Sequence, residues 1–133
     1  MFAGVADTHT AIWYLFNDDR LSSASGKFID QAGADGIGIA ISSISLAEIV
    51  YLIEKARIPA SVYTELKAAL SDPEHVFREA VVTSEIVDAM QQIPRGAVPD
   101  LPDRIVAATG LYFDVPVISR DGKIKASSVR TIW

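Results

Sequence analysis

Four acidic side chains in this sequence lie where chemistry is often placed, directly after apolar segments or at the start of helical ones. Asp7 ends a short apolar run, Glu48 follows a longer one after a short loop, Asp103 opens a helical pattern, and Asp121 follows another apolar segment. Two carboxylates about 5 Å apart repel each other by roughly 3 kcal/mol at an effective dielectric constant near 20. If these four converge, the cluster requires either protons or a cation.

The amino-acid composition restricts which cation such a cluster would bind. The chain has no cysteine and two histidines, so thiolate metal sites and cysteine nucleophiles are excluded and the available ligands are mainly oxygens. Oxygen ligands select hard ions, Mg²⁺ or Mn²⁺, over zinc. A divalent ion held by carboxylates binds the non-bridging oxygens of a phosphate, lowers the pKa of an attacking water and stabilises the leaving oxygen. Phosphoryl chemistry is therefore the activity expected of the cluster.

Each acid also has a purely structural explanation. Asp7 is suited to cap a helix that begins at Thr8, and residues 45–48 match the S-x-x-E capping box. A negative charge in a first helical turn, as at Asp103, is favoured by the helix dipole, and Asp121 followed by glycine is a common turn pair. Taken singly, each acid leaves both explanations open; the functional one gains weight only if the acids gather.

Short strand-like and longer helix-like segments alternate along the chain, without internal repeats. Strands are predicted at residues 2–6, 37–41, 76–82, 115–119 and 129–132, and helices at residues 11–16, 22–32, 45–56, 59–70, 84–92 and 103–113. This alternation predicts an α/β fold with a parallel sheet covered by helices on both faces. Ligands of such sheets bind outside the carboxyl ends of the strands, and all four acids are assigned to strand exits or helix starts.

Two segments bear most directly on the environment of Glu48. The run IGIAI at residues 37–41 is apolar almost throughout, which is typical of a central strand covered on both faces. The helix predicted at residues 45–56 is apolar on nearly every side, so we expect it to be largely enclosed. Glu48 would then be at least partly desolvated.

Length and charge limit the protein class. A chain of 133 residues is expected to form one domain over residues 1–133, and 50% hydrophobic with 22% charged residues indicates a globular protein. No apolar run reaches the roughly 18 residues of a membrane span, and the first residues lack the basic region of a signal peptide, so a cytoplasmic protein without membrane contact is expected. The net charge of -5 argues against coating nucleic acid non-specifically.

The C-terminal segment is locally basic in this acidic chain. Residues 118–133 contain Arg120, Lys123, Lys125 and Arg130 against the single acid Asp121. Such a margin is able to hold a phosphate backbone, and the structural alternative is an ordinary solvated surface.

Four motifs in order resemble those of the PIN-domain ribonucleases: DTH at 7–9, SSISLAEI at 42–49, DLPDRIVAAT at 100–109 and ISRDGKI at 118–124. The forms LAEI and D-x-x-D-R-I-x-A-A are most similar to those of the VapC-type toxins of type II toxin–antitoxin systems. The resemblance covers nearly the whole chain. It implies a three-layer α/β/α sandwich with a central, mostly parallel sheet.

The resemblance also implies an activity and its partners. It assigns catalysis and metal binding to the residues matching Asp7, Glu48, Asp103 and Asp121, with Mg²⁺ or Mn²⁺ as cofactor. The expected reaction is endonucleolytic cleavage of a structured RNA such as tRNA or rRNA, by attack of a metal-activated water that leaves 5′-phosphate and 3′-hydroxyl ends. The expected partners are a cognate antitoxin protein, whose C-terminal segment lies across the site, and a second copy of the chain in a homodimer.

Further residues are assigned around this pocket. Thr8, Asp100 and Ser119 are expected beside the metal-binding carboxylates, where the hydroxyls would hold a water or phosphate oxygen and Asp100 would support or cap the helix. The basic residues expected to contact the RNA backbone are Arg104, Arg120, Lys123 and Lys125. Many relatives read H-x-D-P-F-D-R where this chain has VPDLPDR at 98–104, so no histidine has a role there. His9 and His75 are expected at the surface or in caps.

Two other functional classes remain open. A catalytically inactive PIN-like binding module would use its acids only as helix caps. An aspartyl phosphotransferase or receiver-like domain would also place acids at strand ends, but the aspartyl phosphatase pattern requires a second aspartate two residues after the first, where this chain has His9.

Overall fold

A five-stranded sheet forms the centre of the protein in a computed structural model that describes residues 1–133. Its strands are β1 (Phe2–Ala6), β2 (Gly38–Ser42), β3 (Phe77–Ala80), β4 (Val117–Ile118) and β5 (Thr131–Ile132). They lie in the order β3-β2-β1-β4-β5, and every neighbouring pair is parallel. The parallel sheet expected from the alternating pattern is therefore confirmed.

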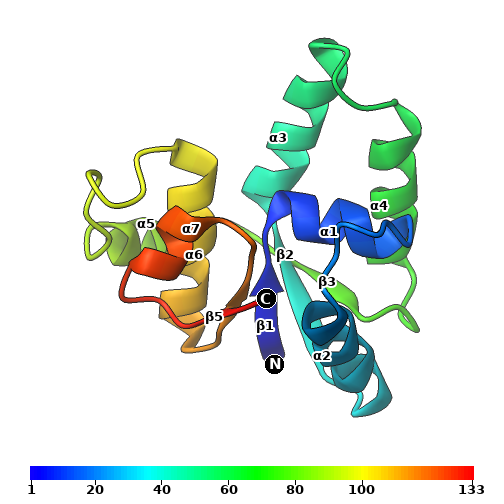
Figure 1. The fold of residues 1–133 in the computed structure, drawn as a ribbon, viewed down its shortest axis with the longest axis horizontal. Coiled ribbons are helices and arrows are strands. Elements are labelled where there is room, and N and C mark those ends of the chain that lie inside the picture. Colours follow the sequence, from blue (N-terminus) through cyan, green and yellow to red (C-terminus); the bar gives the residue numbers. More distant parts are fainter.

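Seven helices cover the two faces of this sheet. They are α1 (Thr8–Leu15), α2 (Ser23–Ala34), α3 (Ser43–Glu54), α4 (Ser61–Ser71), α5 (Ser84–Met90), α6 (Leu101–Phe113) and α7 (Gly122–Ala126). Figure 1 shows α1 to α4 grouped on one side of β1 and α5 to α7 on the other. The side chains follow the same division, because successive strand residues point to opposite faces: Val5 packs in the core with α5 to α7, and Ala6 packs in the core with α1, α2 and α4. The three-layer α/β/α sandwich is confirmed.

The order of the strands places a topological switch point between β1 and β4. From β1 the chain builds outward through β2 to β3, and it then crosses back through α5 and α6 to place β4 on the other side of β1. The connecting helices consequently leave β1 and β4 toward opposite faces. A crevice opens outside the carboxyl ends of two strands at such a point, and it is where α/β sheets bind ligands. Here those ends carry Asp7 and Ser119.

Most predicted elements are confirmed to within a few residues. The first strand is found at the predicted residues, and the fully buried strand β2 is shifted by one residue at each end from its predicted span. The middle position of the sheet belongs to β1, while β2 is its inner neighbour. The short helix α7 was not predicted, because its first residues read as a turn. None of the seven helices combines the length and apolar character required to cross a bilayer.

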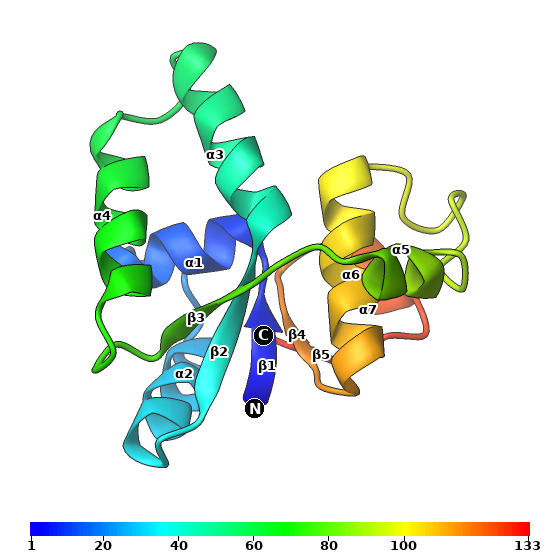
Figure 2. The ribbon, with the colours of Figure 1, turned by 180° about the vertical axis from the view of Figure 1, so that it is seen from behind.

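The expectation that α3 is enclosed is wrong. Only Ser45 and Ile49 of this helix are buried, while Val50 and Tyr51 are 39% and 56% exposed. Figure 2 shows why: α3 extends beyond the sheet toward the connection with α4, so its C-terminal half lacks a layer on one side. Glu48 itself is half-buried, and the helices that contact α3 are α1, α4 and α6.

Candidate active site

A cavity of about 480 Å³ lies at the carboxyl ends of β1 and β4. It is lined by Asp7, His9, Trp13, Glu48, Asp100, Asp103, Arg120, Asp121 and Lys123. The structure thus brings together all four acids singled out in the sequence, although they lie on segments up to 114 residues apart by number, and it adds Asp100 to them. Trp13 is the single hydrophobic residue of the lining.

Asp7 is held in place at both of its carboxylate oxygens. It is the N-cap of α1, with Oδ1 accepting a hydrogen bond from the backbone N–H of Thr10 at 2.9 Å. Its Oδ2 accepts a hydrogen bond of 2.5 Å from the hydroxyl of Ser119, which is fully buried. The same Ser119 oxygen accepts a bond from the backbone N–H of Asp121 at 3.0 Å. Ser119 therefore ties the exit of β1 to the exit of β4.

Glu48 is linked to the same edge through a threonine. The capping-box interpretation of residues 45–48 is wrong, because α3 begins at Ser43 and its N-cap is Ser42, whose side chain accepts from the Ile44 N–H. Glu48 instead accepts a hydrogen bond at Oε1 from the hydroxyl of Thr8, at 2.5 Å. The Thr8 hydroxyl is also hydrogen-bonded to Ser45, at 2.9 Å. Thr8 and Ser45 are buried, so this contact fixes one oxygen of Glu48.

Asp103 lies in the first turn of α6, which Asp100 caps by accepting a hydrogen bond from the Asp103 backbone N–H at 3.1 Å. The capping role expected for Asp100 is thus observed. The pKa of Asp103 is raised to about 8 by several causes acting together: first burial, then the negative charge of Asp100, hydrogen bonding to the Asp121 side chain, and the charges of Asp121 and Glu48. Asp103 is the cavity carboxyl group whose ionisation the neighbouring negative charges oppose.

Asp121 begins the helix that was not predicted. It is the N-cap of α7, with Oδ1 accepting from the backbone N–H of Lys123 at 2.8 Å. A turn was expected at this position; the structure has a short helix there, and Asp121 makes the local hydrogen bond that begins it. The carboxylate remains at the cavity, opposite α6, where it approaches Asp103 closely enough to affect its pKa.

The cavity has the donor chemistry for a hard dication, but its side chains are not arranged as a finished metal site. Five carboxylates face two cationic side chains, Arg120 and Lys123, and no ion pair joins the two groups. No three of the chain's acidic or histidine side chains are grouped closely enough to bind one ion together. Hydrogen bonds within the protein explain part of this spacing, because Asp7 and Glu48 are directed toward Ser119 and Thr8.

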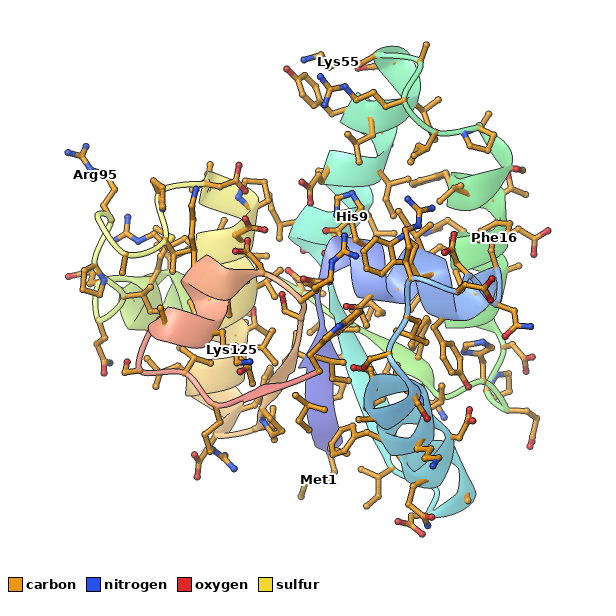
Figure 3. All side chains as sticks on the ribbon, in the orientation of Figure 1. Met1, His9, Phe16, Lys55, Arg95 and Lys125 are labelled. Atoms are coloured by element: carbon orange, nitrogen blue, oxygen red, sulfur yellow. The ribbon has the colours of Figure 1, made fainter.

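The basic residues predicted to contact RNA separate into two groups. Arg120 and Lys123 line the cavity. Lys125 is exposed on α7 and does not line the cavity. Figure 3 shows it away from His9, which lies at the start of α1 beside the base of α3.

Arg104 has another role in this structure. Its guanidinium donates hydrogen bonds to the carbonyls of Ile93 at 2.8 Å and Met90 at 3.2 Å, which connects α6 to the end of α5.

Two lining residues were not expected from the sequence. His9 and Trp13 lie four residues apart on α1, and this spacing places them on one face of a helix. Their rings are 5.7 Å apart. Because α1 begins directly after Asp7, that face is turned to the cavity, and the spacing is the signal that would have identified both residues. His75, by contrast, accepts a hydrogen bond from the Phe77 N–H far from the site.

The chain is similar to several known proteins. A family model described as PIN domain matches residues 5–128. Ribonuclease VapC22 of Mycobacterium tuberculosis is 26% identical over 120 residues, which cover 90% of this chain and 88% of that protein.

Two solved structures share the fold. The crystal structure of VapBC2 from Rickettsia felis bound to a DNA fragment from their promoter aligns with a TM-score of 0.71 at 15% identity and covers 96% of both chains. A toxin-antitoxin complex from Klebsiella pneumoniae aligns with a TM-score of 0.64 at 22% identity, covering 98% of this chain and 96% of that one.

Proposed function

The chain belongs to the PIN-domain family, and from this premise we propose that it is a VapC-type endoribonuclease, the toxin of a toxin–antitoxin pair. The proposed reaction is metal-dependent hydrolysis of a phosphodiester bond in a structured RNA, either tRNA or rRNA. The observation that carries the proposal is the convergence of five carboxylates on one cavity at the switch point of the sheet. The ribonuclease among the relatives supports the substrate class.

The residues proposed to hold Mg²⁺ or Mn²⁺ are Asp7, Glu48, Asp103 and Asp121. When bound, the ion would neutralise these carboxylates, bind phosphate oxygens and lower the pKa of water. The raised pKa of Asp103 supports this assignment, because a carboxyl group that resists ionisation in the free protein gains most from an added positive charge. Ser119 and Thr8 keep Asp7 and Glu48 oriented through their buried hydroxyls.

The remaining steps use side chains of the rim. A cavity carboxylate accepts the proton of the attacking water, whose oxygen bonds to phosphorus in line as the bond between phosphorus and the 3′ oxygen breaks. The departing 3′ oxygen takes a proton from solvent, so the products carry 5′-phosphate and 3′-hydroxyl ends. Arg120 and Lys123 hold the RNA backbone beside the cavity, and Lys125 extends this basic margin along α7. Arg104 is left out of the proposed contacts, since carbonyl groups of the protein occupy its guanidinium.

The proposed partner is a cognate antitoxin protein. One of the solved structures with this fold is a toxin-antitoxin complex, and the other is VapBC2 bound to promoter DNA. An acidic cavity next to the exposed apolar side chains Val50 and Tyr51 on α3 suits an amphipathic basic segment, which would satisfy the charge and cover the apolar residues. The homodimer implied by the resemblance stays a prediction.

The proposal is tested by RNA cleavage with controlled metal content. Total cellular tRNA and rRNA are incubated with the purified chain in EDTA, and then with excess Mn²⁺ or Mg²⁺. We expect cleavage only after metal is restored, with 5′-phosphate ends identified by ligation-dependent sequencing, and we expect Asp103→Asn to abolish it. Glu65→Gln, which removes one exposed negative charge on α4, is the matched control and should cleave normally. If the folded chain binds RNA but does not cleave it with either metal, the nuclease proposal is wrong and the alternative, a catalytically inactive binding module, is supported.

A further inference from the structure

The ring of Trp13 carries two guanidinium groups. The Cζ atom of Arg120 lies 4.6 Å from the ring centroid, and that of Arg20 lies 5.1 Å from it. Trp13 itself is 5% exposed and lies on α1. Its ring is supported by Trp133, whose ring centroid is 5.9 Å away in an edge-to-face arrangement of 64°. Trp13 is therefore a fixed surface on which both arginines rest.

The two arginines differ in what their N–H groups do. Arg20 is occupied by Asp18: its Nε and Nη2 donate to the two carboxylate oxygens at 3.0 and 2.7 Å, and it lies outside the cavity lining. Arg120 lines the cavity and is exposed, yet its guanidinium makes neither an ion pair nor a hydrogen bond within the chain. The structure thus contains one occupied and one free guanidinium on the same ring.

The free state of Arg120 requires an explanation, because five carboxylates line the same cavity. A flexible arginine there would be expected to fold onto one of them, as Arg20 does onto Asp18. Contact with the ring of Trp13 fixes where the guanidinium lies, and this interaction strengthens as the pair is desolvated. It does not prevent pairing, since Arg20 contacts the same ring and pairs with Asp18; Arg120 is unpaired because no carboxylate lies within ion-pair distance of the position that the ring gives it. Stacking uses the face of the guanidinium and leaves its in-plane N–H groups available, which is the geometry for bidentate binding of a phosphate.

We propose that Trp13 is a positioning residue for substrate binding: its ring holds Arg120 at the rim of the cavity, away from the carboxylates, so that the guanidinium binds a phosphate of the RNA backbone. This inference rests on the proposed function, which makes RNA the substrate. It assigns to Trp13 a role that acts only through Arg120, and it assigns to Trp133 the support of the ring. Arg20 shares the ring and has no part in binding.

The experiment is a double-mutant cycle between positions 13 and 120, measured as RNA affinity. A short fluorescein-labelled single-stranded RNA is titrated with the full chain carrying Asp103→Asn, which prevents cleavage, in Mg²⁺ buffer at several salt concentrations. Arg120→Ala, Trp13→Leu and the double variant are compared in this background. Trp13→Phe is the conservative variant, and Arg20→Ala is the matched control because it removes an arginine from the same ring.

We expect Arg120→Ala and Trp13→Leu each to weaken binding roughly tenfold, the loss expected for one hydrogen-bonded contact to a charged group. The slope of log K against log salt should become shallower by about 0.7 in both, the value for one phosphate contact on a single strand. The double variant should be no weaker than either single variant, Trp13→Phe should keep most of the affinity, and Arg20→Ala should match the parent. Additive losses at positions 13 and 120 would overturn the proposal, as would an unchanged salt slope in Trp13→Leu.

Two further measurements keep these outcomes interpretable. Circular dichroism shows whether Trp13→Leu is folded; if it is not, the cycle is run with Trp13→Phe, whose smaller loss must disappear in the Arg120→Ala background for the proposal to stand. Cleavage by the unmodified chain tests the proposed function separately. If the chain cleaves RNA but the effects at positions 13 and 120 are independent, the proposed function stands and the positioning role of Trp13 is overturned. A chain that neither cleaves nor binds RNA would lose both.

Discussion

Replacing Asp103 with asparagine should change how the stability of the metal-free chain depends on pH. In the folded chain the pKa of Asp103 is raised from 3.8 to about 8, so folding takes up a proton at this residue between these two values. The stabilisation from the protonated form is fully present below the unfolded pKa and is lost as the pH rises through about 8. Asparagine resembles the protonated acid and does not titrate, so the variant should lack this loss.

The size of the effect follows from the shift. A shift of about four pKa units corresponds to about 6 kcal/mol, but the side chain is only half-buried, and solvent screening reduces the expected difference to about 2 kcal/mol. Urea unfolding in EDTA measures it at pH 5, 7 and 8.5. The variant should be more stable than the wild type by only about 0.5 kcal/mol at pH 5, just above the unfolded pKa, and by about 2 kcal/mol at pH 8.5.

The comparison has a matched control and a refuting result. Glu65→Gln also removes one negative charge, but from the exposed face of α4, and should follow the wild type at every pH within about 0.5 kcal/mol. Added Mn²⁺ should stabilise the wild type at pH 8.5 and have little effect on Asp103→Asn. If the variant were equal to or less stable than the wild type at pH 8.5 without metal, Asp103 would not bear the repulsion of the cavity, and the metal assignment would lose its main physical support.

Substitutions at three further positions test separate parts of the site and fold. Thr8→Val removes the hydroxyl that orients Glu48; it should lower Mn²⁺ affinity in isothermal titration while leaving the urea midpoint within the range expected for one lost hydrogen bond, about 1 kcal/mol. Asp100→Ala removes the N-cap of α6 and should destabilise the chain by about 1 kcal/mol in urea, whereas Asp100→Asn should not, because asparagine caps equally well. Gly110→Ala would place a Cβ 2.7 Å from Val117 Cγ2, and thermal unfolding should show a loss of about 1–3 kcal/mol because α6 would have to move away from β4.

The approximate position of the site could be predicted from the sequence because strand exits are visible in it. An apolar run that ends in an acid defines a residue at the carboxyl edge of a parallel sheet, and this rule identified Asp7 and Asp121 without knowledge of the strand order. The rule does not give the order itself. Only the pairing of β1 with β4 places the two acids beside each other, and this pairing joins residues more than 100 positions apart.

Local sequence failed where several residues compete for one role. Ser42, Ser43 and Ser45 are all suitable helix caps, and the match to a capping box favoured the last of them. In the structure Ser42 ends β2 and caps α3 at once, so the helix begins earlier and Glu48 lies in its second turn, facing Thr8. Which serine caps the helix depends on where the preceding strand ends, and packing in the folded chain determines that position.

Arg104 shows the same limit on a helix. It follows Asp103 in sequence, and that adjacency suggested a place beside the cavity. Successive residues of a helix point about 100° apart, however, so a side chain next to one that faces the cavity is directed elsewhere. Arg104 reaches the carbonyls at the end of α5. Trp13, six residues after Asp7, faces the cavity because it lies four residues from His9, which does the same.

Three acids of the cluster combine a capping role with a place at the cavity. Asp7, Asp100 and Asp121 each cap a helix with one carboxylate oxygen and still line the cavity, so the N-termini of α1, α6 and α7 supply partial positive charge beside a concentration of negative charge. Glu48 has the Thr8 hydroxyl in place of a backbone partner.

Asp103 differs from all of these acids, because no N–H or hydroxyl group outside the acidic cluster donates to its carboxylate. Partial burial and the neighbouring carboxyl groups of Asp100, Asp121 and Glu48 therefore raise its pKa to about 8. Four of the five acids thus accept hydrogen bonds from N–H or hydroxyl groups of the chain. The fifth, Asp103, is stabilised only by an added positive charge or by a proton. If the proposed cation binds in the cavity, its binding is coupled at Asp103 to the loss of a proton.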